Sequence, residues 1–272
     1  MRLNFSEGLN FKGSIVPSAK PKINIDGGPT LDELTIVTTL AADEFTLLID
    51  IGTDRRVEIT GQELLDREAY EGRAATAGQF VLSFVDALAR TLQGEMLTGL
   101  VTRPDDRVIL TLEVEAGVVG TKVATLYMET SPNRPEEFRL YILPESVQVT
   151  KIGKNPFAGF RQGTRPEQNY IRRVFAYGAI THASVKQDRK TTFGEGELPK
   201  AVNDARLLRN GKTVPTSSTC FVLDPVVRGN SIYDLWDTYN VEAMRVTFTT
   251  SDTNDIRALT EYVQDMRDEK AK

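Results

Sequence analysis

The feature that most constrains the fold of this 272-residue chain is a set of short sequence matches that recurs in the same order in its two halves. Each match is too short to be significant alone, but all four occur in order, at offsets of 134 to 143 residues. Self-similarity at a nearly fixed spacing is typical of a repeated structural unit. The matched pairs are Asp54-Arg55-Arg56 with Asp188-Arg189-Lys190, Leu64-Leu65 with Leu207-Leu208, Phe80-Val81-Leu82 with Phe221-Val222-Leu223, and Arg107-Val108 with Arg245-Val246.

A connector divides the two halves near the midpoint of the chain. The segment Ser131–Pro135 reads SPNRP, and two prolines in five residues make a poor strand and a good linker. We therefore predict two domains. Residues 1–133 would form an N-terminal arm and a first β domain, and residues 134–272 a second β domain with a C-terminal helix.

Most of each half has the pattern of short β-strands. Leu31–Leu40 and Phe45–Ile51 are rich in β-branched residues, and Arg107–Glu115 alternates apolar and polar side chains. Thr121–Thr130 follows a glycine-containing turn, so this segment and Arg107–Glu115 are predicted to form a hairpin. Strands of this number suit an eight-stranded sandwich or jelly roll in each half. The buried face of Arg107–Glu115 should carry Val108, Leu110, Leu112 and Val114.

Two helices are predicted inside the halves. Thr60-Gly61-Gln62-Glu63 is a capping box, in which the Thr60 hydroxyl accepts from the Glu63 amide while Glu63 reaches back to the Thr60 amide. That helix should end at about Glu71. The second should cover about Glu197–Arg209, with Asn210-Gly211 as its C-terminal cap.

A third helix is predicted at the C-terminal end, over about Asn254–Glu269, with Asp252 or Thr253 as its N-cap. Its apolar residues recur at helical spacing and form one stripe. The stripe consists of Ile256, Leu259, Val263 and Met266.

Composition excludes several classes of function. The single cysteine, Cys220, rules out an internal disulfide and any thiolate metal cluster, and the single histidine, His182, rules out multi-histidine metal sites. The formal net charge of −5 provides no global basic field for nucleic acid. The first 20 residues lack a secretory signal, and no apolar run is long enough to span a bilayer. We expect synthesis in a reducing compartment, most simply the cytoplasm.

Motifs for nucleotide binding and nucleophilic catalysis are absent. Gly153-Lys154 lacks the glycine that a phosphate-binding loop needs, Gly194 and Gly196 lack the third glycine of a dinucleotide fingerprint, and Gly229-Asn230-Ser231 lacks the closing glycine of a nucleophile elbow. His182 could serve Ser217 or Ser218 as a base, but an ordinary polar residue at a strand end explains it better. No catalytic and no cofactor-binding residue is predicted.

The carboxylates favour structural over catalytic roles. Glu113 and Glu115 share a strand face and Asp43-Glu44 occupy a turn, without a second carboxylate placed across a cleft as a glycosidase needs. Asp252–Asp255 resembles a calcium loop superficially, but Arg257 stands where the sharp turn needs glycine. Calcium between acidic loops of neighbouring subunits is left open, and no metal ligand is assigned.

Basic residues gather in two places and in the N-terminal arm. The ordinary interpretation is polar strand faces and intersubunit pairs; the sharper one is a surface for an acidic partner, another subunit or anionic lipid. The arm before the first long strand is expected to order on a neighbouring subunit during assembly. The residues are Arg161, Arg165, Arg172 and Arg173; Lys186, Arg189 and Lys190; and Arg2, Lys12, Lys20 and Lys22, beside Glu7 and Asp26, in the arm.

Two jelly-roll-sized halves, each with a helix before an aromatic-and-valine strand, resemble the double-jelly-roll major capsid proteins of icosahedral viruses that carry an internal membrane. Compact corticovirus-type coat proteins are the most similar in size. The resemblance lies in order and pattern over nearly the whole chain. It rests on Leu34–Thr39, Val57–Leu65, Gln79–Val85 and Arg107–Glu115 in the first half, and on Tyr170–Ala176, Leu198–Leu208, Cys220–Asp224, Ser231–Trp236 and Met244–Thr250 in the second.

The resemblance implies a mainly β double jelly roll that works as a structural protein of the virion. Three copies would form a homotrimer of pseudo-hexagonal outline, which would contact neighbouring capsomers, other capsid proteins and an internal lipid membrane in a bacteriophage shell. It implies no enzymatic activity and no sequence-specific contact with nucleic acid.

Two other functions stay open at this point. A viral spike, receptor-binding or carbohydrate-binding β-sandwich would expose aromatic residues on loops, whereas Tyr233, Trp236 and Tyr239 are spaced like a packed segment. A β-sandwich enzyme, such as a carbohydrate-active hydrolase, would need the paired acids that the sequence does not show.

Overall fold

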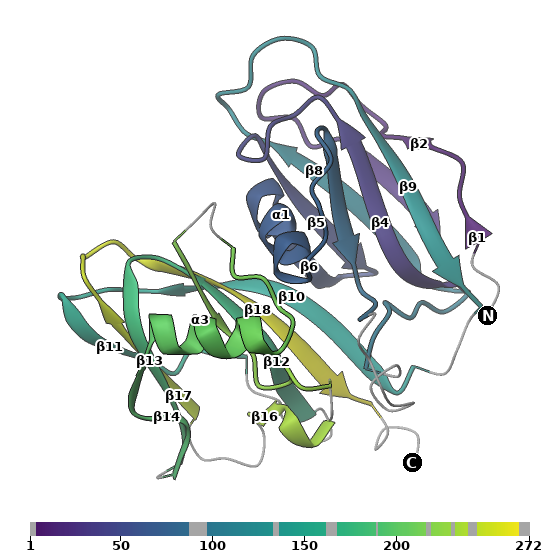
Figure 1. The fold of residues 1–272 in the computed structure, drawn as a ribbon. Coiled ribbons are helices and arrows are strands. Elements are labelled where there is room, and N and C mark those ends of the chain that lie inside the picture. Colours follow the sequence, from purple (N-terminus) through teal and green to yellow (C-terminus); the bar gives the residue numbers. More distant parts are fainter. Residues whose placement is uncertain are drawn as a thin grey trace.

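The computed structural model describes residues 4–86, 97–132, 136–161, 168–188, 190–215, 219–229, 232–238 and 244–266. Within these ranges the chain forms two β-sandwiches that lie side by side, one from each half of the sequence (Figure 1). In the described part of each sandwich there is one α-helix, of ten residues.

The first sandwich contains one four-stranded path, β1-β9-β4-β7, and a second of order β6-β5-β8-β3. A two-residue strand, β2 (Leu9–Asn10), adds to β9. The elements are β1 (Asn4–Phe5), β3 (Lys22–Asp26), β4 (Thr30–Thr38), β5 (Phe45–Ile51), β6 (Asp54–Thr60), α1 (Gly61–Tyr70), β7 (Gln79–Ser83), β8 (Arg107–Val114) and β9 (Ala124–Ser131).

The second sandwich contains the paths β10-β18-β12-β15 and β14-β13-β17-β11. A short strand, β16 (Trp236–Asp237), adds to β12 after a 3-10 turn at Ile232–Asp234. The elements are β10 (Phe138–Val147), β11 (Gly153–Phe157), β12 (Gln168–Tyr177), β13 (Ile180–Gln187), β14 (Lys190–Pro199), α3 (Lys200–Arg209), β15 (Cys220–Leu223), β17 (Met244–Thr250) and β18 (Ile256–Asp265).

The two sandwiches have the same topology. When the eight main strands of each half are numbered along the described chain, both halves have one sheet of order 1-8-3-6 and one of order 2-7-4-5. This strand order is that of a jelly roll. The helix also falls at the same place, between the fifth and sixth strands. The predicted fold class, two consecutive jelly rolls with flanking helices, is confirmed.

One sheet continues from the first sandwich into the second. Strand β10 pairs with β18 of its own sandwich and, in parallel orientation, with β6 of the first, where Ile142 lies opposite Val57. The β10-β18-β12-β15 sheet and the β6-β5-β8-β3 sheet are therefore joined edge to edge into one continuous sheet. This pairing makes the connection between the halves part of the sheet system, so the orientation of the halves is fixed by backbone pairing as well as by side chains.

Each sandwich buries an apolar core by strand alternation. The predicted inward face of β8, which carries Val108, Leu110 and Leu112, is fully buried. Phe80 of β7 lies opposite Ile36 and packs edge-on against Phe45, with 4.9 Å between ring centroids. Phe221 of β15 is buried in the core of the second sandwich. The period of two in the sequence thus placed the core correctly.

Both internal helices form where the sequence indicates. The capping box at Thr60 is present in both directions, and α1 ends at the C-cap Glu71. Helix α3 begins at Lys200, three residues later than predicted, and its N-cap is Pro199. The caps superpose the two helices at an offset of 139 residues, so the Leu64-Leu65 and Leu207-Leu208 match is wrong by one helical turn.

The predicted C-terminal helix is wrong. Residues Ile256–Asp265 form strand β18, which pairs with β10 on one side and β12 on the other. Alternate side chains of β18 enter the second core and the junction with the first sandwich, so both faces are buried. A strand buried on both faces loses its period-two pattern, and its apolar residues then imitate a helical stripe. Asp252 instead accepts from the amide of Asn254 in the turn before β18.

The hairpin and the arm also differ from expectation. β8 pairs with β5 and β3, whereas β9 pairs with β4, β1 and β2, so the two strands lie in different sheets. A tight turn and a jelly-roll crossing have similar sequences, and long-range pairing decides between them. The described part of the arm forms β1, β2 and β3, which pair with strands of its own sandwich, so this part is ordered within the single chain.

Phe80→Ala and Phe221→Ala should each lower the free energy of unfolding by about 3–5 kcal/mol, because each removes a buried ring from an equivalent place in one core. Urea or guanidinium unfolding of the purified protein measures the loss. Val119→Ala, at a side chain that is 83% exposed, is the control and should change little. A loss at only one of the two phenylalanines would contradict the equivalence of the two cores.

Candidate functional site: the junction between the sandwiches

Helix α1 belongs to the first sandwich but is covered by the second. Leu64 packs into the apolar cluster of the first half, whereas Arg67, Tyr70 and Glu71 extend to β12, β18 and the end of β15. Phe175 of β12 meets the Tyr70 ring edge-on, with 5.4 Å between centroids. The outer face of the β10-β18-β12-β15 sheet is therefore buried, and charged side chains from both halves meet there.

Glu261 of β18 lies at the centre of this junction and is almost fully buried. Its Oε1 accepts a hydrogen bond from Arg67 Nε at 2.8 Å. Its Oε2 lies 3.8 Å from Arg172 Nη1 and 3.7 Å from Arg173 Nη1. One carboxylate thus connects an arginine of α1 with two consecutive arginines of β12.

Arg173 has the most partners in the junction. Its Nε donates to Asp224 Oδ2 at 3.0 Å, and its Nη1 lies 2.9 Å from Glu71 Oε1. The hydroxyl of Tyr70 donates to the same Asp224 oxygen at 2.6 Å, and the Arg173 guanidinium lies 5.0 Å from the Tyr70 ring centroid. These contacts attach the C-terminal turn of α1 to the second sandwich.

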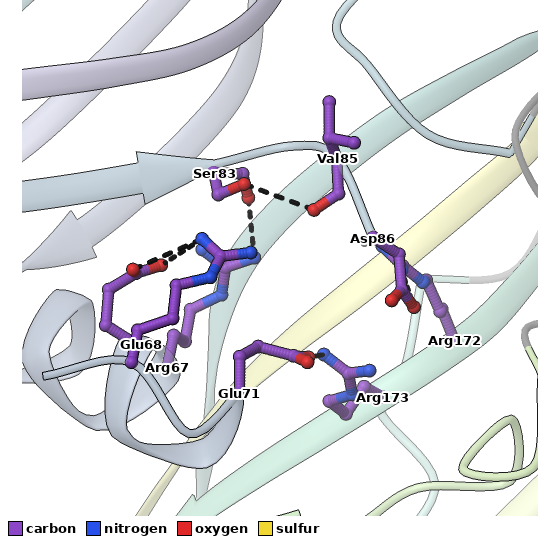
Figure 2. Close-up of a pocket in the computed structure, with 9 residues that line it drawn as sticks. Arg67, Glu68, Glu71, Ser83, Val85, Asp86, Arg172 and Arg173 are labelled. Atoms are coloured by element: carbon purple, nitrogen blue, oxygen red, sulfur yellow. Dashed lines mark hydrogen bonds and ion pairs between the residues drawn. The ribbon is translucent and has the colours of Figure 1, made fainter. Parts of the chain in front are cut away.

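Two further ion pairs lie in the same junction. Lys212 Nζ lies 2.5 Å from Glu71 Oε2, and Arg172 Nη2 lies 3.1 Å from Asp86 Oδ2. Figure 2 shows Glu71, Asp86, Arg172 and Arg173 converging on a narrow space beside α1. That space measures about 10 Å³, room for about one water molecule. A substrate does not fit, so the arrangement can join the two sandwiches and offers no cleft for catalysis.

Electrostatics keep these groups ionised. Burial by itself would raise the pKa of Glu261, but Arg67, Arg173 and Arg172 outweigh it and hold the pKa at about 2. Burial opposes the charge of Arg173 as well, and Asp224, Glu261 and Glu71 overcome it and raise its pKa. The pKa of Glu71 is lowered, because Arg173 and Lys212 outweigh its burial. Each charge is retained only because its partners are present.

The sequence indicated Arg172 and Arg173 as surface residues, and the structure corrects this: both are buried in the junction. Arg161 lies against the Tyr141 ring, with 4.2 Å from its guanidinium carbon to the centroid, and Lys186 is exposed. Arg2, Arg165, Arg189 and the side chain of Lys190 lie outside the described residues. A consecutive pair of arginines within a strand of buried character (Tyr170–Ala176) was the available signal, because such a pair needs buried acidic partners.

The candidate nucleophilic and acidic residues are not brought together. His182 is half-exposed on β13 with its Nδ1 3.0 Å from Thr181 Oγ1, and Ser217 and Ser218 lie outside the described residues. Glu113 pairs with Lys20, and Glu44 pairs with Lys122 at 2.8 Å. Asp255 accepts from the amide of Val149. These partners are lysines and backbone groups of the same sandwich, which is a structural role.

Within the described ranges no three His, Cys, Asp or Glu side chains gather in a way that could hold a metal ion. No helix in the part of the chain that the structure describes is long and apolar enough to cross a bilayer. Trp236 is buried against Phe193 while Tyr233 is exposed, and Tyr239 lies outside the described residues.

Comparison with protein families matches both halves of the chain. Residues 7–130 match the model of the viral coat protein P2 N-terminal domain, and residues 140–266 match that of the viral coat protein P2 C-terminal domain. No curated protein matches the sequence.

Solved structures with the same fold include the major capsid protein P2 from bacteriophage PM2, with a TM-score of 0.84, 13% identity and coverage of 96% of this chain and 97% of that chain. The capsid protein of Sulfolobus turreted icosahedral virus has a TM-score of 0.67, 12% identity and coverage of 96% and 97%. The protein VP54 of the virus PBCV-1 has a TM-score of 0.58, 8% identity and coverage of 98% and 96%. At these identities the likeness establishes the fold alone.

Glu261→Gln should lower the free energy of unfolding at pH 7 by about 3–5 kcal/mol, because three buried arginines then face an uncharged amide. The pKa of Glu261, about 2, lies below the ordinary value of 4.5. Its stabilising contribution is therefore complete above pH 4.5 and is lost as the pH falls toward 2. Chemical unfolding at stepped pH should show the difference between wild type and variant shrinking across that window.

The matched control is Glu113→Gln, which breaks the partly exposed pair with Lys20 and should cost less than about 1 kcal/mol. Equal losses in the two variants, or a Glu261→Gln effect that does not change with pH, would contradict the role given to the buried junction.

Proposed function

Because the chain belongs to the viral coat protein P2 family, whose two domain models match residues 7–130 and 140–266, we propose that it assembles as homotrimers that tile an icosahedral shell. A viral coat protein is a structural component of the virion, and its function requires self-association and contact with neighbouring capsid proteins. The family supports this function and not the spike, carbohydrate-binding or enzymatic alternatives.

The observation that carries the trimer is the repeated topology. Both halves have sheets of order 1-8-3-6 and 2-7-4-5, so one chain presents two nearly equivalent sandwiches. Three chains would then present six, and a closed ring of three has a pseudo-hexagonal outline. Pseudo-hexagonal units tile a curved shell with few kinds of contact, and a closed ring buries the side faces of every subunit.

The buried junction supports the same proposal. A tile must keep its two sandwiches at a constant angle, and the β10–β6 pairing together with the ion pairs around Glu261 fixes that angle. Contacts between tiles can be individually weak, because many of them act together in a closed shell.

The shell is proposed to lie over an internal membrane, to contact its lipid, and to make no sequence-specific contact with nucleic acid. A net charge of −5 suits a protein that covers lipid, because it provides no basic field for compacting a genome. We further propose that the chain is made in the host cytoplasm and completes its function in the virion.

Assembly is proposed to need no cofactor. The ion pairs at the junction are satisfied by the protein's own side chains, Arg67, Arg173 and Lys212 among them. The exception to cofactor-free assembly that must be tested is a calcium ion bound between acidic loops of neighbouring subunits.

Mass photometry of the purified protein should give a principal species of three chains. Images of assembled particles should show units of hexagonal outline above a lipid bilayer. Only monomers or dimers under every assembly condition tried would overturn the trimer. A shell packed directly on nucleic acid would overturn the membrane assignment alone.

Dialysis against EDTA should leave the trimer and its thermal unfolding temperature unchanged, with dialysis against Mg²⁺ and Ca²⁺ as the reference. If EDTA dissociates the trimer and Ca²⁺ restores it, the proposal of cofactor-free assembly is wrong and a calcium site lies between subunits.

A further inference from the structure

The two equivalent helices have different surroundings. Helix α1 is enclosed between the two sandwiches, whereas α3 lies on the outside of the second sandwich (Figure 1). On α3, Val202 is 51% exposed and Leu208 57% exposed, and only Asn203 and Leu207 are buried. A helix with the same place in the fold as α1 thus presents an apolar and basic side that remains exposed among the residues the structure describes.

The β-ladders relate the surface under α1 to a surface of the first sandwich, residue by residue. Strand β4 has an irregular register between Leu31 and Glu33, and β12 has the same irregularity between Ile171 and Arg173, so the two strands superpose at an offset of 140 residues. The cross-strand partners then fix β7, β9 and β1. The resulting pairs are Phe5 with Ile142, Glu33 with Arg173, Thr35 with Phe175, Val81 with Val222, Thr125 with Arg257, Tyr127 with Leu259 and Glu129 with Glu261.

The members of these pairs differ in burial. In the second sandwich six of the seven, all but the partly exposed Arg257, are buried, because α1 and the first sandwich lie over them. In the first sandwich the corresponding residues lie on the outside of the β1-β9-β4-β7 sheet and are exposed or half-exposed. Phe5, for example, is 65% exposed, whereas Ile142 is 4% exposed. We name the exposed set, Phe5, Glu33, Thr35, Val81, Thr125, Tyr127 and Glu129, the docking face.

The helix caps give the corresponding residues of the helices. With Thr60 and Pro199 as N-caps, three of the side chains of α1 that reach the second sandwich, Glu63, Arg67 and Tyr70, correspond to Val202, Arg206 and Arg209 of α3. All three of these α3 residues are exposed or half-exposed. The Arg206 guanidinium also donates to the Asp224 carbonyl at 2.9 Å and lies 5.2 Å from the Phe193 ring centroid, so this side of α3 is accessible in part.

The charges on the two uncovered surfaces are complementary. Inside the chain, Arg67 binds Glu261 at 2.8 Å; the corresponding residues are Arg206 and Glu129. Inside the chain, Arg173 stacks on Tyr70; the corresponding residues are Glu33 and Arg209, again of opposite charge.

The internal contact of Glu63 with Arg257, and the pair of carboxylates on the docking face, also favour complementary surfaces. Glu63 binds Arg257 at 2.6 Å inside the chain, and the corresponding Val202 and Thr125 can pack together. Glu33 and Glu129 stand opposite each other on β4 and β9. Burial and this neighbouring carboxylate raise the pKa of Glu33, and Arg73 of the same chain, 3.7 Å away, offsets this only in part. An arginine from another chain would relieve the remaining repulsion.

We infer that α3 of one subunit docks on the docking face of a second copy of this chain, with Arg206 against Glu129, Arg209 against Glu33 and Val202 against Thr125. This contact repeats between chains the junction that α1 makes within one chain. It rests on the proposed homotrimer, and it identifies the surfaces that meet in it. The contact is head-to-tail, because it joins two different surfaces of neighbouring chains. Such contacts form a closed ring only when the rotation from one sandwich to the next fits a whole number of times into 360°.

Crosslinking tests the contact in the full-length protein. Val202→Cys combined with Thr125→Cys, treated with a short bismaleimide, should give a denaturing-gel ladder of two and three chains and no more. A reagent with some length is needed, because Glu63 and Arg257, the internal equivalents, meet through long side chains. The native Cys220 is fully buried and does not compete for the reagent.

The matched control pairs Val202→Cys with Val119→Cys, which is on an exposed loop between β8 and β9 and outside the docking face. It should give no ladder, and neither should the single variants. A wild type that is trimeric while Val202→Cys/Thr125→Cys gives no ladder would overturn this contact and leave the trimer standing. A ladder beyond three chains would show an open chain of contacts and overturn the closed ring. A wild type that is monomeric under every condition would overturn the proposed function itself.

A charge swap tests the chemistry of the contact. Arg209→Glu should weaken trimer formation by about tenfold or more, because it places a carboxylate against Glu33, and adding Glu33→Arg should restore most of the loss. Arg107→Glu, at an exposed residue of β8 away from both surfaces, is the control. Thermal unfolding of each variant separates misfolding from weak association. An Arg209→Glu trimer as stable as the control, or a double variant no better than the single, would overturn the pairing.

Discussion

The structure depends on one sheet whose two faces are both buried. The β10-β18-β12-β15 sheet closes the core of the second sandwich with one face and receives α1 with the other. Strands β12 and β18 therefore carry apolar residues toward one side and a mixture of apolar and ionised residues toward the other. The ionised side chains are not placed there for stability alone, because well-packed apolar residues can stabilise such a junction equally well. Their benefit is specificity: Glu261 accepts from Arg67 only at one position of α1 against β18.

That specificity explains how a duplicated fold becomes a rigid building unit. Two sandwiches joined only by a linker such as Ser131–Pro135 would move relative to each other, as domains with small polar interfaces do. Here the parallel pairing of Ile142 with Val57 continues a sheet across the boundary, and the ion pairs fix the second contact point at α1. Two separate attachments prevent rotation about either one. The chain therefore presents its outer surfaces at constant angles, which a shell built from repeated contacts requires.

The sequence predicts correctly those strands that have one solvent-exposed face, and its prediction fails for strands with no exposed face. The alternation of β8, the capping box at Thr60 and the match of Phe80 with Phe221 were all readable, because each depends on neighbours along the chain or on a single buried face. Strand β18 was misread as a helix because both of its faces are buried, and no polar alternation marks it. The hairpin of β8 and β9 was misread because pairing in a jelly roll is decided by strands far apart in sequence. The burial of Arg172 and Arg173 cannot be read from the sequence for the same reason: their partners Glu71, Asp224 and Glu261 lie 51 to 102 residues away along the chain.

The difference between the two helices follows from when each is covered. Helix α1 is enclosed as the chain folds, so it can carry Tyr70, Glu63 and Asp66 as buried groups whose partners arrive in the same molecule. Helix α3 and the docking face must stay in water until a second copy arrives, so a large apolar patch on them would cause aggregation of free subunits. A few apolar residues, Val202 and Phe5 among them, beside arginines and carboxylates of opposite sign form a surface that is soluble alone and complementary in pairs. The duplicated halves have therefore kept the same docking geometry but differ in the side chains that line it. The contact inside the chain is permanent, and the proposed contact between chains is reversible.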